Sequence, residues 1–169
     1  MKLFNGAVAA ALVCACATPS VVRADQIKDM AEKAGFTRCK VEIDDIEKRY
    51  LADARDSSAD ASDVSKGDSK PFVVAVAVLD EKGERTQLHV TFVPRGTSGC
   101  DYVLLETRHV PQHCNTALQA REGGYNYVGP WGEGMSAMQD TDGHDGFLFT
   151  PSADVESCVV TRRELQFGK

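Results

Sequence analysis

The sequence lacks the short motifs that mark the commonest small catalytic and cofactor sites. It contains no C-x-x-C pair, no G-x-x-x-x-G-K-[ST] loop and no G-x-S-x-G turn. These absences exclude a thioredoxin-like redox site, the common zinc ribbons, a P-loop and a serine-hydrolase nucleophile elbow. What remains, with 43% hydrophobic and 26% charged residues, is the composition of an ordinary globular domain.

Basic residues are outnumbered by acidic ones, 19 to 25. The segment 1–24 holds two of the 19 Lys and Arg and none of the 25 Asp and Glu, so removing it changes the net charge from −6 to −8. Affinity for nucleic acid comes largely from Lys and Arg at phosphates, and an anionic membrane surface attracts the same side chains. We therefore expect no nucleic-acid partner and no binding to an anionic membrane surface.

The first 24 residues have the three regions of a secretory signal peptide. Lys2 supplies the positive start, 7–17 is an apolar run of small residues, and 22–24 has the small-x-small pattern of a cleavage site. The run is too short for a transmembrane helix, which needs about 20 apolar residues. We predict that residues 1–24 are removed, that 25–169 form a single secreted domain, and that the protein is exported, periplasmic or secreted.

Cys16 offers an alternative location for the same domain. An apolar residue three positions before it and Ala15 directly before it loosely fit the processing site of bacterial lipoproteins. A lipid anchor at Cys16 would tether the domain to the outer membrane without changing its fold. The hypotheses for location therefore include an outer-membrane-tethered form.

Four cysteines follow the signal segment, an even number that indicates two disulfides in an exported chain. If 100–110 is one strand, Cys114 lies beyond the end opposite Cys100, too far away for a bridge between them. If the final strand, starting at Cys158, runs antiparallel to it, Cys158 begins near Cys114. We therefore predict the pairs Cys39–Cys100 and Cys114–Cys158.

Hydrophobic periodicity predicts an α+β fold, with an antiparallel sheet (a meander plus a second hairpin), one or two short helices and two disulfides. A nearly continuous apolar strand at 72–79, a turn at 80–84 and an alternating return strand lead into a third strand at 100–110. Short helices are expected after Asp25, which can cap the first of them, and at 112–121.

Two further segments are predicted from their side chains. Residues 36–43 alternate in polarity, as a half-buried strand does. Residues 56–70 are rich in Ser, Asp and Ala, so they bury little surface, and we expect a mobile surface loop there.

A weak internal repeat is present. Phe92-Val93-Pro94 followed by Cys100 resembles Phe149-Thr150-Pro151 followed by Cys158, and each cysteine opens a β-rich run. The similarity is either chance or the sign of two related hairpins in one sheet.

Half of the 14 glycines lie in 121–146, which we therefore expect to be a loop. Its aromatic residues either pack on the edge of their own sheet or present a contact surface to a partner. The acidic turn at 140–145, within the same segment, does not fit the register of an EF-hand calcium loop. We predict no metal site and no cofactor. The candidate binding residues are Tyr125, Tyr127, Trp131, Asp140, Asp142 and His144.

Three hypotheses of function follow. The first is an exported, disulfide-stabilised binding or inhibitory module that acts on another protein in the periplasm or cell envelope. The second is a small periplasmic hydrolase that uses carboxylate and His acid–base chemistry, with Glu133, Asp140 or Asp142 beside His144. The third is a structural envelope lipoprotein. The sequence favours the first, because no set of residues requires a particular reaction.

Overall fold

The computed structural model describes residues 25–62, 67–96, 99–121, 123–153 and 155–167. The expected signal peptide, with Cys16, lies outside the described residues. In chain order the elements are α1 (Gln26–Lys33), α2 (Lys40–Tyr50), β1 (Ala54–Ser62), the 3-10 turn η1 (Gly67–Ser69), β2 (Phe72–Asp80), β3 (Arg85–Pro94), β4 (Cys100–Val110), α3 (Cys114–Gln119), β5 (Tyr125–Pro130), β6 (Ser136–Asp140), β7 (Asp145–Pro151) and β8 (Cys158–Gln166).

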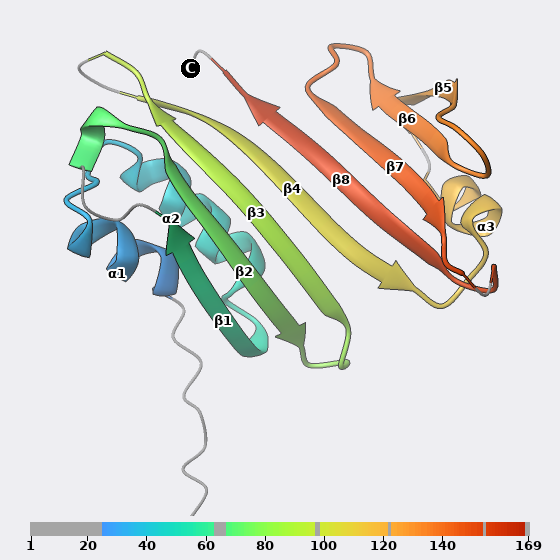
Figure 1. Ribbon diagram of the computed structural model, residues 1–169, viewed down its shortest axis with the longest axis horizontal. Coiled ribbons are helices and arrows are strands. Elements are labelled where there is room, and N and C mark those ends of the chain that lie inside the picture. The colour runs from blue at the N-terminus through green and yellow to red at the C-terminus, as the bar shows by residue number, and fades with distance from the viewer. Residues whose placement is uncertain (1–24, 63–66, 97–98, 122, 154, 168–169) are drawn as a thin grey trace, which may run out of the picture.

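All eight strands form one antiparallel sheet with the order β1-β2-β3-β4-β8-β7-β6-β5. The helices pack against one face, and Figure 1 views the sheet from the other face, with α2 behind β2 and β3. We call the uncovered side the open face. The sheet dominates the fold, so the predicted α+β class matches only roughly, whereas the antiparallel sheet and the two disulfides are present.

The chain consists of two halves with the same plan. The N-terminal half (α1 to β4) and the C-terminal half (α3 to β8) each place four strands after a helix, and their last strands pair antiparallel at the centre of the sheet. Both halves also carry an equivalent disulfide, because Cys39 precedes α2 and Cys114 begins α3, while Cys100 and Cys158 begin β4 and β8. The pairs Cys39–Cys100 and Cys114–Cys158 are those expected from an antiparallel final strand.

The weak sequence repeat therefore corresponds to related hairpins in one sheet. Phe92-Val93-Pro94 ends β3 and Phe149-Thr150-Pro151 ends β7, each one strand before a bridged cysteine. In β4 and β8 equivalent residues differ by 58 in number, so the equivalent pair Leu105 and Arg163 lie directly opposite each other. A pseudo-twofold axis passes between these two residues.

Each half has its own hydrophobic cluster on the helix side of the sheet. The larger cluster joins α1 and α2 to β2, β3 and β4 around Phe92, Leu88 and Ile46. The smaller one joins α3 to β6, β7 and β8 around Phe149 and Phe147. Charged side chains of β4 and β8 lie between the two clusters, and they form the polar seam described below.

Three sequence-based expectations were wrong in detail. Of the loop expected at 56–70, residues 56–62 belong to the edge strand β1, 67–69 form η1, and 63–66 lie outside the described residues. In β1, Ala59 and Ala61 pack against the core and the polar residue between them faces outward. Small side chains are enough to pack this strand against the core, because β1 is at the edge of the sheet and pairs with β2 alone. The strand expected at 36–43 does not form: 36–39 belong to no helix or strand, 40–43 begin α2, and Val41, one of the alternating apolar residues, is exposed. The Gly-rich segment contains the hairpin β5–β6.

The start of α1 is capped differently from the prediction. The side chain of Asp25 makes no capping hydrogen bond. The buried carboxylate of Glu47 in α2 instead accepts hydrogen bonds from the backbone N–H groups of Ile27 and Lys28, at 2.6 and 3.0 Å. Burial raises the pKa of Glu47 above its ordinary value. This contact ties α2 to the first turn of α1. Within the described ranges, no helix has the length and apolarity required to cross a bilayer.

Candidate functional site

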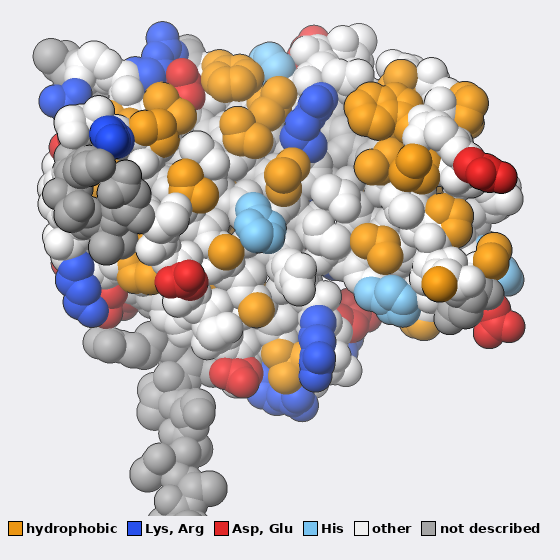
Figure 2. Space-filling view, in the orientation of Figure 1, with side chains coloured by type: hydrophobic (Ala, Val, Ile, Leu, Met, Phe, Trp, Pro, Cys, Tyr) orange, Lys and Arg blue, Asp and Glu red, His pale blue; other side chains and the backbone are white. Residues whose placement is uncertain are grey.

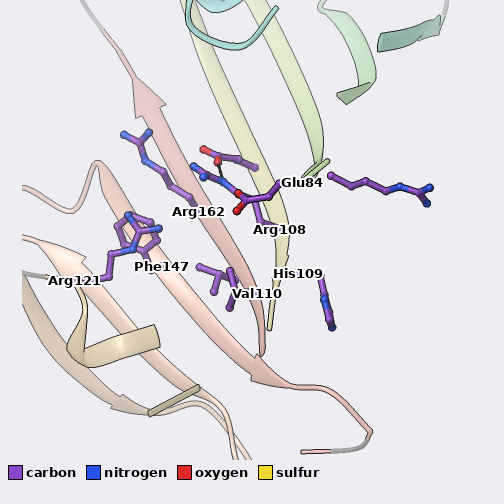
Figure 3. Close-up of a pocket in the computed structure, with 10 residues that line it drawn as sticks. Glu84, Arg108, His109, Val110, Arg121, Phe147 and Arg162 are labelled. Carbon is purple, nitrogen blue, oxygen red and sulfur yellow. Dashed lines mark hydrogen bonds and ion pairs between the residues drawn. The ribbon is translucent and has the colours of Figure 1, made fainter. Parts of the chain in front are cut away.

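Two concave regions are candidate sites, one between the two halves of the sheet and one in the C-terminal half. The first lies in the polar seam on the helix side (Figure 3). The second is a groove on the open face, beside the β5–β6 hairpin. They differ in whether their charged side chains already have partners within the protein.

Glu106 is the most buried carboxylate of the seam, with 2% of its surface exposed. It accepts a hydrogen bond of 2.9 Å from the hydroxyl of Tyr50, and it pairs with the guanidinium of Arg108. Burial, together with the Glu106 charge, raises the pKa of Tyr50, so the hydroxyl stays protonated as a donor. Figure 3 shows His109 pointing away from this cluster, and its ring bonds Ser157 at 2.9 Å.

Arg162 joins the carboxylates of the C-terminal half. Its Nη2 lies 2.6 Å from Oδ2 of Asp145 and 3.3 Å from Oε2 of Glu164. The bond to Asp145 raises the pKa of Arg162. Burial alone would raise the pKa of Asp145, but the hydrogen bonds from Arg162 and Tyr125 outweigh it and lower that pKa. Burial alone would also raise the pKa of Glu164, but the hydrogen bonds from Arg49 and Tyr102 outweigh this effect and lower that pKa.

The charged side chains of the seam thus find their partners mostly within the seam itself. Its cavity has a volume of only about 60 Å³, and its carboxylates are already paired with arginines. Arg121 differs, because its guanidinium lies 4.2 Å from the centre of the Phe147 ring and no described carboxylate is within ion-pair distance of it. Figure 3 shows the side chain of Arg121 beside this ring. We interpret the seam as the structural connection between the two halves.

The groove on the open face has the composition of a contact site. Its volume is about 300 Å³, which is the lower end of the range for ligand pockets. Figure 2, drawn from the open face, shows hydrophobic side chains gathered over the β5–β6 hairpin. Trp131 and Val128 are 62% and 53% exposed although they border the groove. The groove is also lined by Leu105, Ala137, Leu148, Thr161 and Arg163.

Gly146 opens the floor of this groove. It lies between Gln139 of β6 and Arg163 of β8, and a Cβ atom there would approach the carbonyl oxygen of Met138 to 3.0 Å. The same atom would lie 3.9 Å from the guanidinium of Arg163. That guanidinium reaches the carbonyl of Gly143 at 3.2 Å. A residue with a side chain at position 146 would fill part of the groove and crowd Arg163.

The equivalent place in the N-terminal half is built differently. Gly146 pairs with Arg163, and the equivalent residues His89 and Leu105 pair in the same way in the other half. The exposed imidazole of His89 thus stands where Gly146 leaves space, and an apolar side chain stands where Arg163 carries a charge. The combination of an open floor and a cation is therefore a feature of this groove and not of the repeated plan.

The structure separates the six residues predicted to bind. Trp131 lines the groove, and Tyr127 is exposed on the same hairpin. Tyr125 lies on the helix side, where it bonds Asp145 at 2.9 Å and packs edge-on against Phe147. The remaining three, Asp140, Asp142 and His144, belong to the β6–β7 turn region. Asp140 has one buried oxygen with no hydrogen-bond partner among the described residues, and the ring of His144 packs against Phe167.

Sequence reasoning missed Leu105, Gly146 and Arg163. They come from three different strands, and each looks like an ordinary strand residue in its own segment. Their proximity follows from the pairing of β4 with β8 and of β8 with β7. The repeat was the available signal, since aligning its two copies would have shown Leu105 against Arg163.

Comparisons with models of protein families, with curated proteins and with solved structures find no match to this chain. Within the part of the chain that the structure describes, no group of three or more His, Cys, Asp or Glu side chains is arranged to hold a metal ion. No hydrogen bond joins His144 to Glu133, Asp140 or Asp142 among the same residues. The assignment of a function therefore rests on the geometry of the groove.

Proposed function

We propose that this protein is an exported binding module and that it contacts another protein through the groove on its open face. The observation that carries the proposal is the exposed set of Trp131, Val128, Leu105 and Arg163 around an apolar floor. Trp and Arg are enriched among the residues that dominate binding energy at protein interfaces. An inhibitory role, by occupying a cleft of the partner, is one form of this activity.

The rest of the molecule supports a rigid scaffold for such a contact. Five strands of one antiparallel sheet line most of the groove, so these residues are held by backbone hydrogen bonds. Trp131 lies in the turn between β5 and β6, where its backbone N–H donates to the carbonyl of Met135 at 3.1 Å. Two disulfides constrain the sheet and suit an oxidising compartment. Rigid positioning lowers the entropy lost on association, which favours binding.

The alternative hydrolase hypothesis has less support. It requires a base, an acid and space for a substrate at one place. His144 packs against Phe167 instead of bonding a carboxylate among the described residues. The seam contains buried carboxylates, but they form ion pairs with arginines and the cavity beside them is small. We therefore retain the binding module.

Replacing Trp131 with Ala tests the proposal. We expect the Trp131→Ala variant to lose at least about 30-fold in affinity for a partner captured from the extracellular fraction of the producing cells, because truncating an interface Trp commonly costs 2 kcal/mol or more. Its free energy of unfolding should change by less than about 1 kcal/mol, since the ring is 62% exposed. Surface plasmon resonance and urea unfolding measure the two quantities.

Tyr127→Ala is the matched control. Tyr127 lies on the same hairpin and is 57% exposed, but it does not line the groove. It should retain affinity within about threefold. Equal affinities of wild type and Trp131→Ala for every captured protein would contradict the proposal, as would a loss of stability of 3 kcal/mol or more in Trp131→Ala, which would show the ring to be part of the core.

A further inference from the structure

We propose that the groove binds an acidic peptide segment, in which one apolar side chain enters the groove and a neighbouring carboxylate pairs with Arg163. This inference rests on the proposed function and specifies the chemistry of the partner. It depends on the position and contacts of Arg163, on the shape of the groove, and on the residues that occupy the equivalent positions in the N-terminal half.

Arg163 places a cation on the open face of the sheet, beside the groove. Its guanidinium donates to the carbonyl of Gly143, and among the described residues no carboxylate lies within ion-pair distance. The preceding residue, Arg162, points to the other face and pairs with Asp145 and Glu164. Among the described residues that line the groove, Arg163 is the one that carries a charge.

The arginine stands where the repeated plan places a leucine. Arg163 and Leu105 are equivalent and opposite across the pseudo-twofold axis, so leucine is compatible with the backbone at this position. The groove also needs Gly146, because the equivalent position holds His89. The C-terminal half thus combines space for an apolar group with a charge that attracts an anion.

The openness of the groove favours a peptide over an acyl chain. A volume of about 300 Å³ accommodates one large side chain, while the surrounding surface, with Gln139 and Thr161, is polar enough to border an extended main chain. A long acyl chain in a shallow groove would leave much of its apolar surface in water, whereas ligand pockets cover most of their ligands. A carboxylate one residue away would form charge-assisted hydrogen bonds with Arg163.

The only Trp of the chain reports on this site, because Trp131 borders the groove. The probes are acetylated and amidated heptapeptides, Gly-Ser-Asp-Leu-Asp-Ser-Gly and its counterpart with Asn in place of both Asp. Titrations followed by Trp fluorescence should give at least about fivefold tighter binding of the Asp peptide at low salt, and the ratio should fall as salt is added. Dodecanoate serves as the acyl-chain probe.

Arg163→Leu restores the residue of the N-terminal half. We expect this variant to bind both peptides within about twofold of each other, with the affinity of the Asn peptide unchanged, and Tyr127→Ala to retain the full preference. Equal binding of both peptides by wild type would overturn the inference, as would tighter binding of dodecanoate than of the Asp peptide or no response to either peptide. None of these results alone overturns the proposed function, which is tested separately by the effect of Trp131→Ala on partner affinity and on stability.

Discussion

Replacing Cys114 and Cys158 together with Ala is expected to lower the free energy of unfolding by about 4 kcal/mol. The bridge closes a loop of 44 residues, and the chain-entropy relation gives about 4 kcal/mol for a loop of that length. The loss would be a large fraction of the 5–15 kcal/mol that stabilises a typical domain. Urea unfolding followed by circular dichroism measures it.

The loss should be uneven across the molecule. α3 has six residues, too few to form a stable helix alone, and it depends on the bridge and on the small cluster around Phe149 for its position. Hydrogen exchange in the variant should therefore show reduced protection in α3, β7 and β8 at concentrations of urea where β2 and β3 stay protected. A variant with Ala at Cys39 and Cys100 is the control, because its bridge closes a loop of 61 residues over the larger cluster.

Two outcomes would contradict this prediction. A loss below about 1 kcal/mol would show that packing alone holds α3 on the sheet. Uniform loss of protection over both halves would show that the smaller cluster does not unfold separately, and that the two halves behave as one cooperative unit.

The parts of the fold that could be predicted from sequence are those with strong local periodicity. The segment 72–79 is a continuous apolar run and its return strand alternates in polarity, with a Gly-containing turn between them, so β2 and β3 could be predicted directly. β1 could not be recognised, because an edge strand over Ala59 and Ala61 needs no large apolar residue. The start of α2 was misread since three alternating residues fit both a strand and a helix.

The candidate site was harder to predict than the fold. Trp131 was identified because aromatic residues among glycines are conspicuous, but the floor and the charge of the groove come from strands far apart in the chain. The same applies to the polar seam. Arg162 and Asp145 lie 17 residues apart, and only the pairing of β7 with β8 brings them together. Patterns within one segment carry no information about such contacts.

Arg162→Leu is expected to lower the free energy of unfolding by about 2 to 3 kcal/mol at neutral pH. The substitution leaves the carboxylate of Asp145 with Tyr125 as its remaining side-chain partner, and it removes one of the cations beside Glu164. Removing one member of a fully buried ion pair costs about 3 to 5 kcal/mol, and the partial exposure of these side chains places this pair below that range. Urea unfolding at pH 7 tests the value.

Arg121→Leu is the matched control for charge. It removes an arginine from the same cavity, but that arginine packs on Phe147 and has no described carboxylate partner. Its loss should stay within about 1 kcal/mol, the usual contribution of an exposed cation–π contact. Equal losses in the two variants would contradict the role assigned to the ion pair.

The pH dependence gives a second, independent readout of Arg162→Leu. The folded-state pKa values of Asp145 and Glu164 are both lowered, so these groups contribute stability above their unfolded pKa values of roughly 4 and lose it as the pH falls through the folded values. Wild type should therefore lose more stability than Arg162→Leu between pH 5 and pH 2, and the gap between them should narrow on acidification. A gap that stays constant over this range would show that Arg162 stabilises the seam by packing and not by its charge.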